Sequence, residues 1–305
     1  LGSCTVIASD KTGTLTCNEL TVREVRLADG SVYTVTGEGF APDGSLRSGD
    51  AEVLLGTEVP DALARLVRAG MLNNEGDLHP HHEQPDAWAW RGDPTDIALL
   101  ALARKVHGFE SDHGHPARTR ERHPERASIP FEAENRYSAT WHGGFFAEGG
   151  PGQGRVFVKG APERVLAMCA AAENDVAAER MAMAEDMAAR GLRVLALAEG
   201  DSDHDSVRDG APAEPAGLRF LGFIGMIDPL RPGVREAVAS CRDAGIQVWM
   251  VTGDHPVTAL AIARDLGLAD SPDQVVTGAA LLGKSPEQLR AVIGRSRVFA
   301  RLAPE

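Results

Sequence analysis

Residues 10–16, DKTGTLT, constrain the fold of this chain more than any other segment, because they follow closely on the apolar run CTVIA at residues 4–8. Such a run is typical of a strand buried in a parallel sheet. In open α/β sheets, ligands bind beyond the carboxyl ends of the strands, where Asp10 stands with a lysine, hydroxyl groups and Gly13 behind it. A carboxylate in that place can attack the γ-phosphorus of ATP. The segment therefore predicts a phosphate site; the alternative is a turn in which Asp10 only caps the strand.

Strands and helices alternate in the last third of the chain. The predicted elements are strands at residues 218–227, 247–252 and 297–300 and helices at residues 233–244 and 256–266. This βαβ order predicts a parallel sheet that also contains the strand at residues 4–8. A long insertion separates that first strand from the others. We therefore expect one domain from residues 1–21 and 218–305, and an inserted domain from residues 22–217.

The inserted stretch mixes amphipathic helices with short alternating strands, so it is predicted to be an α+β domain on an antiparallel sheet. The predicted helices are residues 60–72, 97–107 and 176–190, and the strands are residues 126–128, 138–142, 145–147 and 156–158. Residues 21–36 are also strand-like. The glycine-rich residues 149–154 are interpreted as a hairpin loop, and the histidine-rich residues 78–83 as a solvated loop rather than a zinc site.

Composition excludes some classes of function. The net charge of −13 argues against a nucleic-acid partner, since phosphate-backbone binding needs a basic field. No run reaches the roughly 18 apolar residues of a membrane span. The four cysteines lack paired spacing, which favours free thiols over disulfides. The chain begins with Leu1 and carries no signal peptide, which favours a piece of a longer protein.

The segment SDKTGTLT resembles the phosphorylation motif of the P-type cation-transporting ATPases, which belong to the haloacid dehalogenase-like superfamily. Further matching motifs follow in the family's order: GDPTDIALL, PFEAENRYSAT, FVKGAPE, GLRVLALA, DPLRP, MVTGDHPVTA and FARLAPE. GDPT and KGAPE point to the type II, calcium-pump-like group. The resemblance implies a Rossmann-like parallel sheet, incomplete at its C-terminus, that carries phosphorylation, and an inserted nucleotide-binding domain.

The resemblance also implies roles for residues of the predicted parallel sheet. Asp10 would be phosphorylated by ATP and would ligate Mg²⁺ together with the carbonyl of Thr12. The remaining ATP-binding residues implied here are Thr252, Gly253, Asp254 and Arg301, and the implied hinge residues are Asp228 and Arg231. An N-cap formed by Asp254 or His255 is the structural alternative for the TGD segment.

In the inserted domain, the resemblance implies an adenine pocket. Phe131 would stack on the base, Lys159 and Gly160 would line the pocket, and Asp96 would receive the adenine amino group. Arg193 would lie near the β-phosphate. Relatives carry an arginine two residues after the stacking phenylalanine, where this chain has Ala133, and Arg136 is a candidate replacement.

We expect the chain to be the ATP-binding and phosphorylation portion of an ATP-driven cation pump, with Ca²⁺ the favoured ion. Alone it would bind ATP with little turnover. Its other partners would be the parent protein's own membrane helices and actuator domain, at the cytoplasmic side of the cell membrane. A free-standing phosphatase would need a second aspartate at position 12, where Thr12 stands, and a non-catalytic regulatory module would be indicated by a defective Asp10 or TGD segment.

Overall fold

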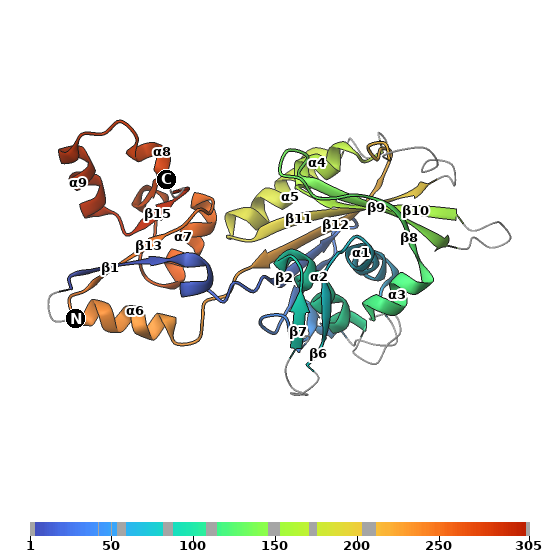
Figure 1. Ribbon diagram of the computed structural model, residues 1–305, viewed down its shortest axis with the longest axis horizontal. Helices are drawn as coiled ribbons and strands as arrows, with labels where there is room; N and C mark the ends of the chain where they lie inside the picture. The colour runs from blue at the N-terminus through green and yellow to red at the C-terminus, as the bar shows by residue number, and fades with distance from the viewer. Residues whose placement is uncertain are drawn as a thin grey trace. The chain divides into compact units, whose positions relative to one another are not determined.

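The computed structural model describes residues 4–41, 43–49, 51–53, 59–81, 88–107, 115–145, 153–170, 176–202 and 212–302 (Figure 1). The chain divides into two compact units. Unit 1 comprises Leu1–Glu19, Asp186–Arg193 and Ile227–Glu305, and unit 2 comprises Leu20–Glu185 and Val194–Met226. Each unit has its own sheet.

Unit 1 is built on a parallel sheet of four strands. In spatial order these are β1 (Val6–Asp10), β13 (Gln247–Val251), β15 (Val298–Ala300) and β14 (Val275–Thr277), and each neighbouring pair runs parallel. The strands predicted near residues 4–8, 247–252 and 297–300 are confirmed, although β1 begins two residues late. Strand β14 was not predicted.

Unit 1 also contains helices between its strands, and the first two of these bury apolar side chains against the sheet. They are α6 (Val234–Asp243), α7 (Pro256–Asp265), α8 (Gly278–Leu281) and α9 (Pro286–Arg295). Val238 of α6 and Leu260 of α7 pack in one apolar cluster with Val248 and Met250 of β13. The predicted helices α6 and α7 are thereby confirmed, since their apolar spacing is what this face requires.

One strand was assigned to the wrong sheet. The run at residues 218–227 was predicted to join the parallel sheet, but β12 (Arg219–Ile227) pairs between β2 and β11 in the large sheet of unit 2. Most of its residues are buried, from Phe220 to Met226. A strand buried on both faces reads as a continuous apolar run in either kind of sheet, so its composition could not decide between them.

Unit 2 is built on a sheet of nine strands in which every described pairing between neighbours is antiparallel. The order is β5 (Ala51–Val53), β4 (Leu46–Ser48), β3 (Val32–Val35), β2 (Thr21–Leu27), β12, β11 (Arg193–Ser202), β10 (Gln153–Gly160), β9 (Tyr137–Phe145) and β8 (Glu125–Ile129). The expectation of an α+β unit on a large antiparallel sheet is confirmed.

Three local predictions in unit 2 need correction or lie outside the described residues. The strand predicted at residues 138–142 continues through Gly143 and Gly144 as β9, which ends at Phe145, the first residue of the second predicted strand; residues 146–147 are outside the description. Part of the predicted histidine-rich loop is strand β6 (Asp77–Pro80), which pairs with β7 (Trp88–Arg91); residues 82–83 are outside the description. Most of the predicted hairpin loop, residues 149–152, is also outside it, and the last residues of that prediction begin β10.

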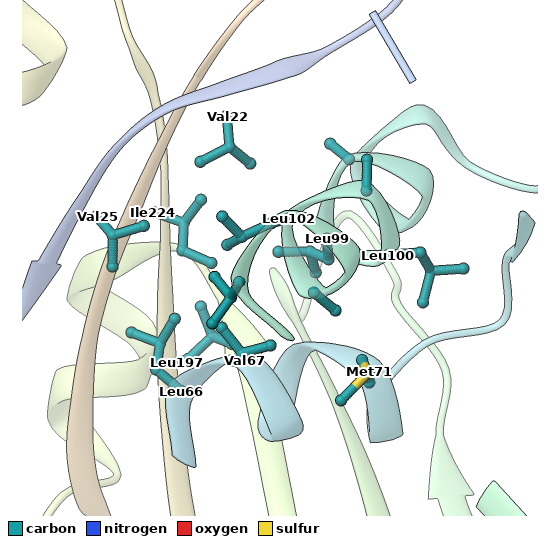
Figure 2. Close-up of a cluster of buried hydrophobic side chains, with 14 of the residues drawn as sticks. Val22, Val25, Leu66, Val67, Met71, Leu99, Leu100, Leu102, Leu197 and Ile224 are labelled. Atoms are coloured by element: carbon teal, nitrogen blue, oxygen red, sulfur yellow. The ribbon is translucent and has the colours of Figure 1, made fainter. Parts of the chain in front are cut away.

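The helices of unit 2 are α1 (Asp61–Leu72), α2 (Pro94–His107), α3 (Pro116–Arg122), α4 (Pro162–Ala167) and most of α5 (Ala177–Ala189). Helices α1 and α2 bury their apolar stripes against the sheet, where Leu66, Leu99 and Ile224 meet (Figure 2). Each such side chain contributes roughly 1.5–3 kcal/mol when fully buried. Gly70 of α1 faces Leu99 of α2, where an added Cβ would lie 3.5 Å from Leu99 Cδ2, an ordinary van der Waals contact. Among the described helices, none has both the length and the apolar character that crossing a bilayer requires.

Candidate functional site

The loop after β1 presents Asp10 at the carboxyl edge of the parallel sheet. Thr12 (φ −74°, ψ 122°) and Gly13 (φ 72°, ψ −1°) are the central residues of a type II turn, which requires a positive φ at its second central position and therefore favours glycine there. Asp10 is exposed, and its side chain makes no capping hydrogen bond to this turn. Nothing in its surroundings therefore supports the interpretation of Asp10 as a mere cap.

Lys11 ties three segments of unit 1 together. Its side chain is only 6% exposed, and its Nζ lies 2.5 Å from Asp254 Oδ2 and 3.6 Å from Asp228 Oδ2. The Thr16 hydroxyl donates to the same Asp228 oxygen at 2.5 Å. A buried ammonium between two carboxylates is the pairing that makes burial of these charges tolerable. Lys11 therefore fixes the loop after β1 to the loop after β13.

The TGD segment follows β13 at the same edge of the sheet, where Val251 is the register partner of Asp10. The Thr252 hydroxyl accepts a hydrogen bond from the Asp254 backbone N–H at 3.1 Å. His255 caps α7 by accepting from the Val257 N–H at 3.4 Å, so the capping alternative holds for His255, while the Asp254 carboxylate faces Lys11.

The turn after β15 brings Arg301 to this edge as well. The Arg301 N–H donates to the Asp254 carbonyl at 3.2 Å, and the Leu302 N–H donates to the Thr252 carbonyl at 3.3 Å. Arg301 has a φ of 53°, a left-handed conformation that costs a non-glycine residue energy and persists only where the surroundings hold it. Gly253 is exposed between these contacts.

The segment that begins at Asp228 runs beside the loop after β1. Leu230 forms an antiparallel bridge with Thr16, and the Arg231 backbone N–H donates to the Leu15 carbonyl at 2.9 Å. Arg231 Nε also donates to the Thr16 carbonyl at 3.1 Å. Asp228 is 9% exposed, and its Oδ1 is buried without a hydrogen-bond partner in the described part of the chain. These contacts attach residues 228–231 directly to the loop that carries Asp10.

In unit 2, a buried ion pair joins α2 to the sheet. Lys159 of β10 donates from Nζ to Asp96 Oδ1 and, at 2.6 Å, to the carbonyl of Asn73, the residue that ends α1. Asp96 Oδ2 accepts from the Glu75 backbone N–H at 3.0 Å. Both side chains are nearly buried, with 11% and 10% exposed. The Asp96 carboxylate is therefore engaged by the protein at both oxygens.

Phe131 lies at the same end of the sheet. It comes two residues after Ile129, the last residue of β8. Ile129 is the register partner of Ala139 in β9, and Ser138, the residue before Ala139, is the register partner of Lys159 in β10. Phe131 is 62% exposed, the largest exposed fraction among the described Phe, Tyr and Trp residues. An aromatic face left in solvent beside a polar cluster can accept a stacked base.

Gly160 ends β10 in a place that only glycine fits. A Cβ there would lie 2.5 Å from the Arg136 carbonyl oxygen and 2.7 Å from Tyr137 Cβ. We expect Gly160→Ala to lower the stability of unit 2 by about 1–3 kcal/mol through overpacking, measured by urea denaturation. Gly294→Ala is the control, because a Cβ at Gly294 in α9 meets nothing within 4 Å. Equal, negligible effects of both changes would contradict the close approach at Gly160.

Arg136 is the candidate replacement for the family's arginine, but its guanidinium is paired with a carboxylate of the protein. Its Nη1 lies 2.5 Å from Glu163 Oε1 at the start of α4, in an exposed ion pair. Its backbone has a φ of 58°, and its carbonyl accepts from the Ala161 N–H at 2.9 Å. In this conformation Arg136 stabilises the turn between β8 and β9 through its backbone and its ion pair with Glu163.

Two histidines predict that the stability of unit 2 depends on pH. The His142 ring is buried, with Nδ1 2.8 Å from the His123 carbonyl, and burial lowers the pKa of both imidazoles. Between these lowered values and the unfolded value of about 6.5, the unfolded chain binds more protons. Unit 2 is therefore expected to lose stability as pH falls below about 6.5. Denaturation midpoints across that range should show a slope that His142→Gln reduces; an unchanged slope would contradict this assignment.

The predicted site residues fall into two groups. Unit 1 holds Asp10, Thr12, Asp228, Arg231, Thr252, Gly253, Asp254 and Arg301, and unit 2 holds Asp96, Phe131, Lys159 and Gly160. Arg193 is exposed at the start of β11, in the short segment that belongs to unit 1. Sequence reasoning missed Thr16 and Asn73. An asparagine directly after an amphipathic helix is a C-terminal signal that could have drawn attention to Asn73.

Comparison with known proteins now defines the class. A family model described as "P-type ATPase, cytoplasmic domain N" matches residues 62–233. Cation-transporting ATPase pma1 of Synechocystis is 41% identical over 317 residues, which cover 100% of this chain and 33% of that protein. The human calcium-transporting ATPase type 2C member 1 is 34% identical, covering 100% of this chain and 31% of the relative. The calcium-transporting ATPase of Bacillus subtilis is 32% identical, with 100% and 33% covered.

The chain belongs to the P-type ATPase family. It spans about a third of the length of these relatives.

Proposed function

We propose that this chain is the ATP-binding and phosphorylation portion of an ATP-driven cation pump. The observation that carries the proposal is the gathering of Asp10, Lys11 and the TGD segment at one edge of a parallel sheet. Membership of the P-type ATPase family supports the same reaction. On this proposal, unit 1 is a haloacid dehalogenase-like phosphorylation domain, and unit 2, Leu20–Glu185 and Val194–Met226, is a nucleotide-binding domain inserted into it.

Asp10 would act as the nucleophile. One carboxylate oxygen attacks the γ-phosphorus of ATP, a new P–O bond forms, the bond to the β-phosphate oxygen breaks, and ADP leaves with the bonding electron pair. The exposed carboxylate of Asp10 supports this role, and the exposed Thr12 offers a backbone N–H and a hydroxyl beside the transferred group. Because Thr12 stands where a hydrolase would have a second aspartate, the aspartyl phosphate would persist.

Mg²⁺ fits the donors at this edge. The Asp10 carboxylate and the Thr12 carbonyl are hard oxygen ligands, and Mg²⁺ typically binds through one or two carboxylates together with waters and substrate phosphates. The described residues contain no cluster of three or more His, Cys, Asp or Glu side chains of the kind that holds a metal without help from substrate. When bound, Mg²⁺ would neutralise part of the phosphate charge that opposes attack by a carboxylate.

In the remaining assignments, Thr252, Gly253, Asp254 and Arg301 would hold and orient the phosphates, and Asp228 and Arg231 would form the hinge. Lys11 serves chiefly to fix the position of Asp254, since its ammonium is already paired. In unit 2, Phe131 would stack on adenine, and Lys159 and Gly160 would line the pocket. Asp96 would act mainly by holding Lys159, because both of its oxygens are engaged, and Arg193 would lie near the β-phosphate.

The whole protein would be a membrane pump, with this portion at the cytoplasmic side of the cell membrane. Its partners would be its own membrane helices and actuator domain. The calcium-transporting relatives support Ca²⁺ as the ion.

The test is phosphoryl transfer in the whole protein. Incubation with γ-³²P-labelled ATP and Mg²⁺ should give an acid-stable, hydroxylamine-labile acyl phosphate, and the isolated chain should show little steady-state turnover. Rapid release of phosphate from small phosphoesters by the isolated chain would instead favour the phosphatase. ATP binding without any label in the whole protein would favour the regulatory module.

A further inference from the structure

The loop that ends α1 joins the helix to two strands of the large sheet through one side chain. Asn73 is 2% exposed, and its Nδ2 donates to the Ser138 carbonyl at 2.9 Å and to the Phe157 carbonyl at 3.1 Å. Its Oδ1 accepts from the Ser138 hydroxyl at 3.0 Å. An asparagine that only ends a helix needs none of these bonds, because its own N–H already donates to the Ala69 carbonyl at 3.0 Å.

The backbone of the same residue meets the proposed nucleotide pocket. The Asn73 carbonyl accepts from Lys159 Nζ at 2.6 Å. Ser138 and Phe157 lie on β9 and β10, directly beside Lys159: Ser138 is the register partner of Lys159, and Phe157 lies two residues before it. The Asn73 side chain is therefore hydrogen-bonded to the two strands beside Lys159, while the Asn73 backbone carbonyl accepts from the Lys159 ammonium.

Contacts from three elements restrict the position of the Lys159 side chain. Asp96 engages the ammonium from α2, Asn73 engages it from the end of α1, and the strand fixes the stem. Hydrogen bonds to a charged group are stronger than those between neutral groups, and a buried ammonium without its acceptors is costly. Any displacement of the Asn73 carbonyl must therefore move Lys159 or leave it under-coordinated.

We propose that Asn73 is a positioning residue of the nucleotide pocket. Its side-chain hydrogen bonds to β9 and β10 fix where its carbonyl, and therefore the Lys159 ammonium, lies. The proposal rests on the proposed function of unit 2 as an ATP-binding unit. Because Asn73 is buried, we expect it to make no contact with ATP itself. Its loss should act on ATP affinity only through Lys159.

The experiment compares three variants of the chain with the wild type. Asn73→Ala removes all three side-chain bonds, and Ser138→Ala removes only the hydroxyl that donates to Asn73 Oδ1. Leu63→Ala is the control, because it opens a cavity in the first turns of the same helix, where Leu63 is fully buried, without touching the lysine. Each protein is measured for ATP affinity by calorimetry, for its unfolding transition, and for the rate at which Lys159 reacts with an amine-directed reagent with and without ATP.

We expect Asn73→Ala to weaken ATP binding about tenfold, equivalent to 1.4 kcal/mol, and to change the reactivity of Lys159. Ser138→Ala should move both quantities in the same direction by a smaller factor. Leu63→Ala should lower the unfolding transition while leaving both unchanged. If Asn73→Ala does not fold, the ATP affinity and the Lys159 reactivity of Ser138→Ala test the proposal instead.

Unchanged affinity and unchanged Lys159 reactivity in the folded variants would overturn the proposal, and so would equal losses in Leu63→Ala. A wild-type chain that binds no ATP would instead overturn the proposed function. In that case unchanged Lys159 reactivity in the variants would still reject the positioning role by itself.

Discussion

Replacing Asp10 with asparagine is expected to abolish the phosphorylated intermediate of the whole protein. The amide keeps the size of the side chain but removes the anionic oxygen that attacks phosphorus, so no acyl phosphate can form. ATP should still bind, since the proposed base pocket lies in unit 2 and Asp10 in unit 1. The label retained after acid precipitation measures the first effect, and calorimetric titration with ATP measures the second.

The control for this prediction is Asp243→Asn. Asp243 is exposed at the end of α6 in the same unit, so its replacement should leave the label at the wild-type level. Label that persists in Asp10→Asn would show that another residue is phosphorylated. Label lost equally in both variants would point to a loss of folding.

Replacing Asp96 with alanine is expected to destabilise unit 2 by about 3 kcal/mol, because the change leaves the Lys159 ammonium buried beside α1 without its carboxylate. The change also frees the Glu75 backbone N–H, which donates to Asp96 Oδ2. Chemical denaturation of the chain measures the loss. Glu214→Ala is the matched control: it breaks the exposed pair with Arg164, which should cost less than about 1 kcal/mol.

The double variant Asp96→Leu with Lys159→Met separates an unpaired charge from a loss of packing. Replacing both partners of a buried pair by apolar residues of similar volume is often neutral or stabilising. The double variant should therefore recover most of the stability that Asp96→Ala loses. A double variant as unstable as Asp96→Ala would contradict the buried pair as the cause.

The local elements of both units could be predicted from the sequence, because their signals are local. Helices α1 and α7 show apolar residues at helical spacing; β1 is an apolar run that ends at Asp10, and the apolar run of β13 is followed by Thr252. The sheet that a strand joins depends on partners far away in the chain, and β12 was therefore misassigned. Its pairing with β2 is made by residues about 200 positions apart, which no local pattern reveals.

The candidate site shows the same division. Asp10 and the TGD segment could be selected from the sequence because each follows an apolar strand, and the chemistry of their residue types is specific. The engagement of Lys159 by Asn73 and the pairing of Lys11 with Asp228 could not be predicted, because each joins segments brought together only by folding. These contacts also alter the proposed role of Asp96, which is occupied by the protein itself.

The measurement that tests the central claim most directly is a titration of the isotopically labelled chain with ATP and Mg²⁺, followed residue by residue by NMR. We expect saturable shifts around Asp96, Phe131 and Lys159. Phe131→Ala should weaken binding about tenfold through the loss of base stacking, whereas Trp90→Ala, which removes another exposed aromatic side chain of unit 2, should not. No shifts at millimolar ATP, or shifts that Phe131→Ala leaves unchanged, would contradict unit 2 as the nucleotide-binding part of this chain.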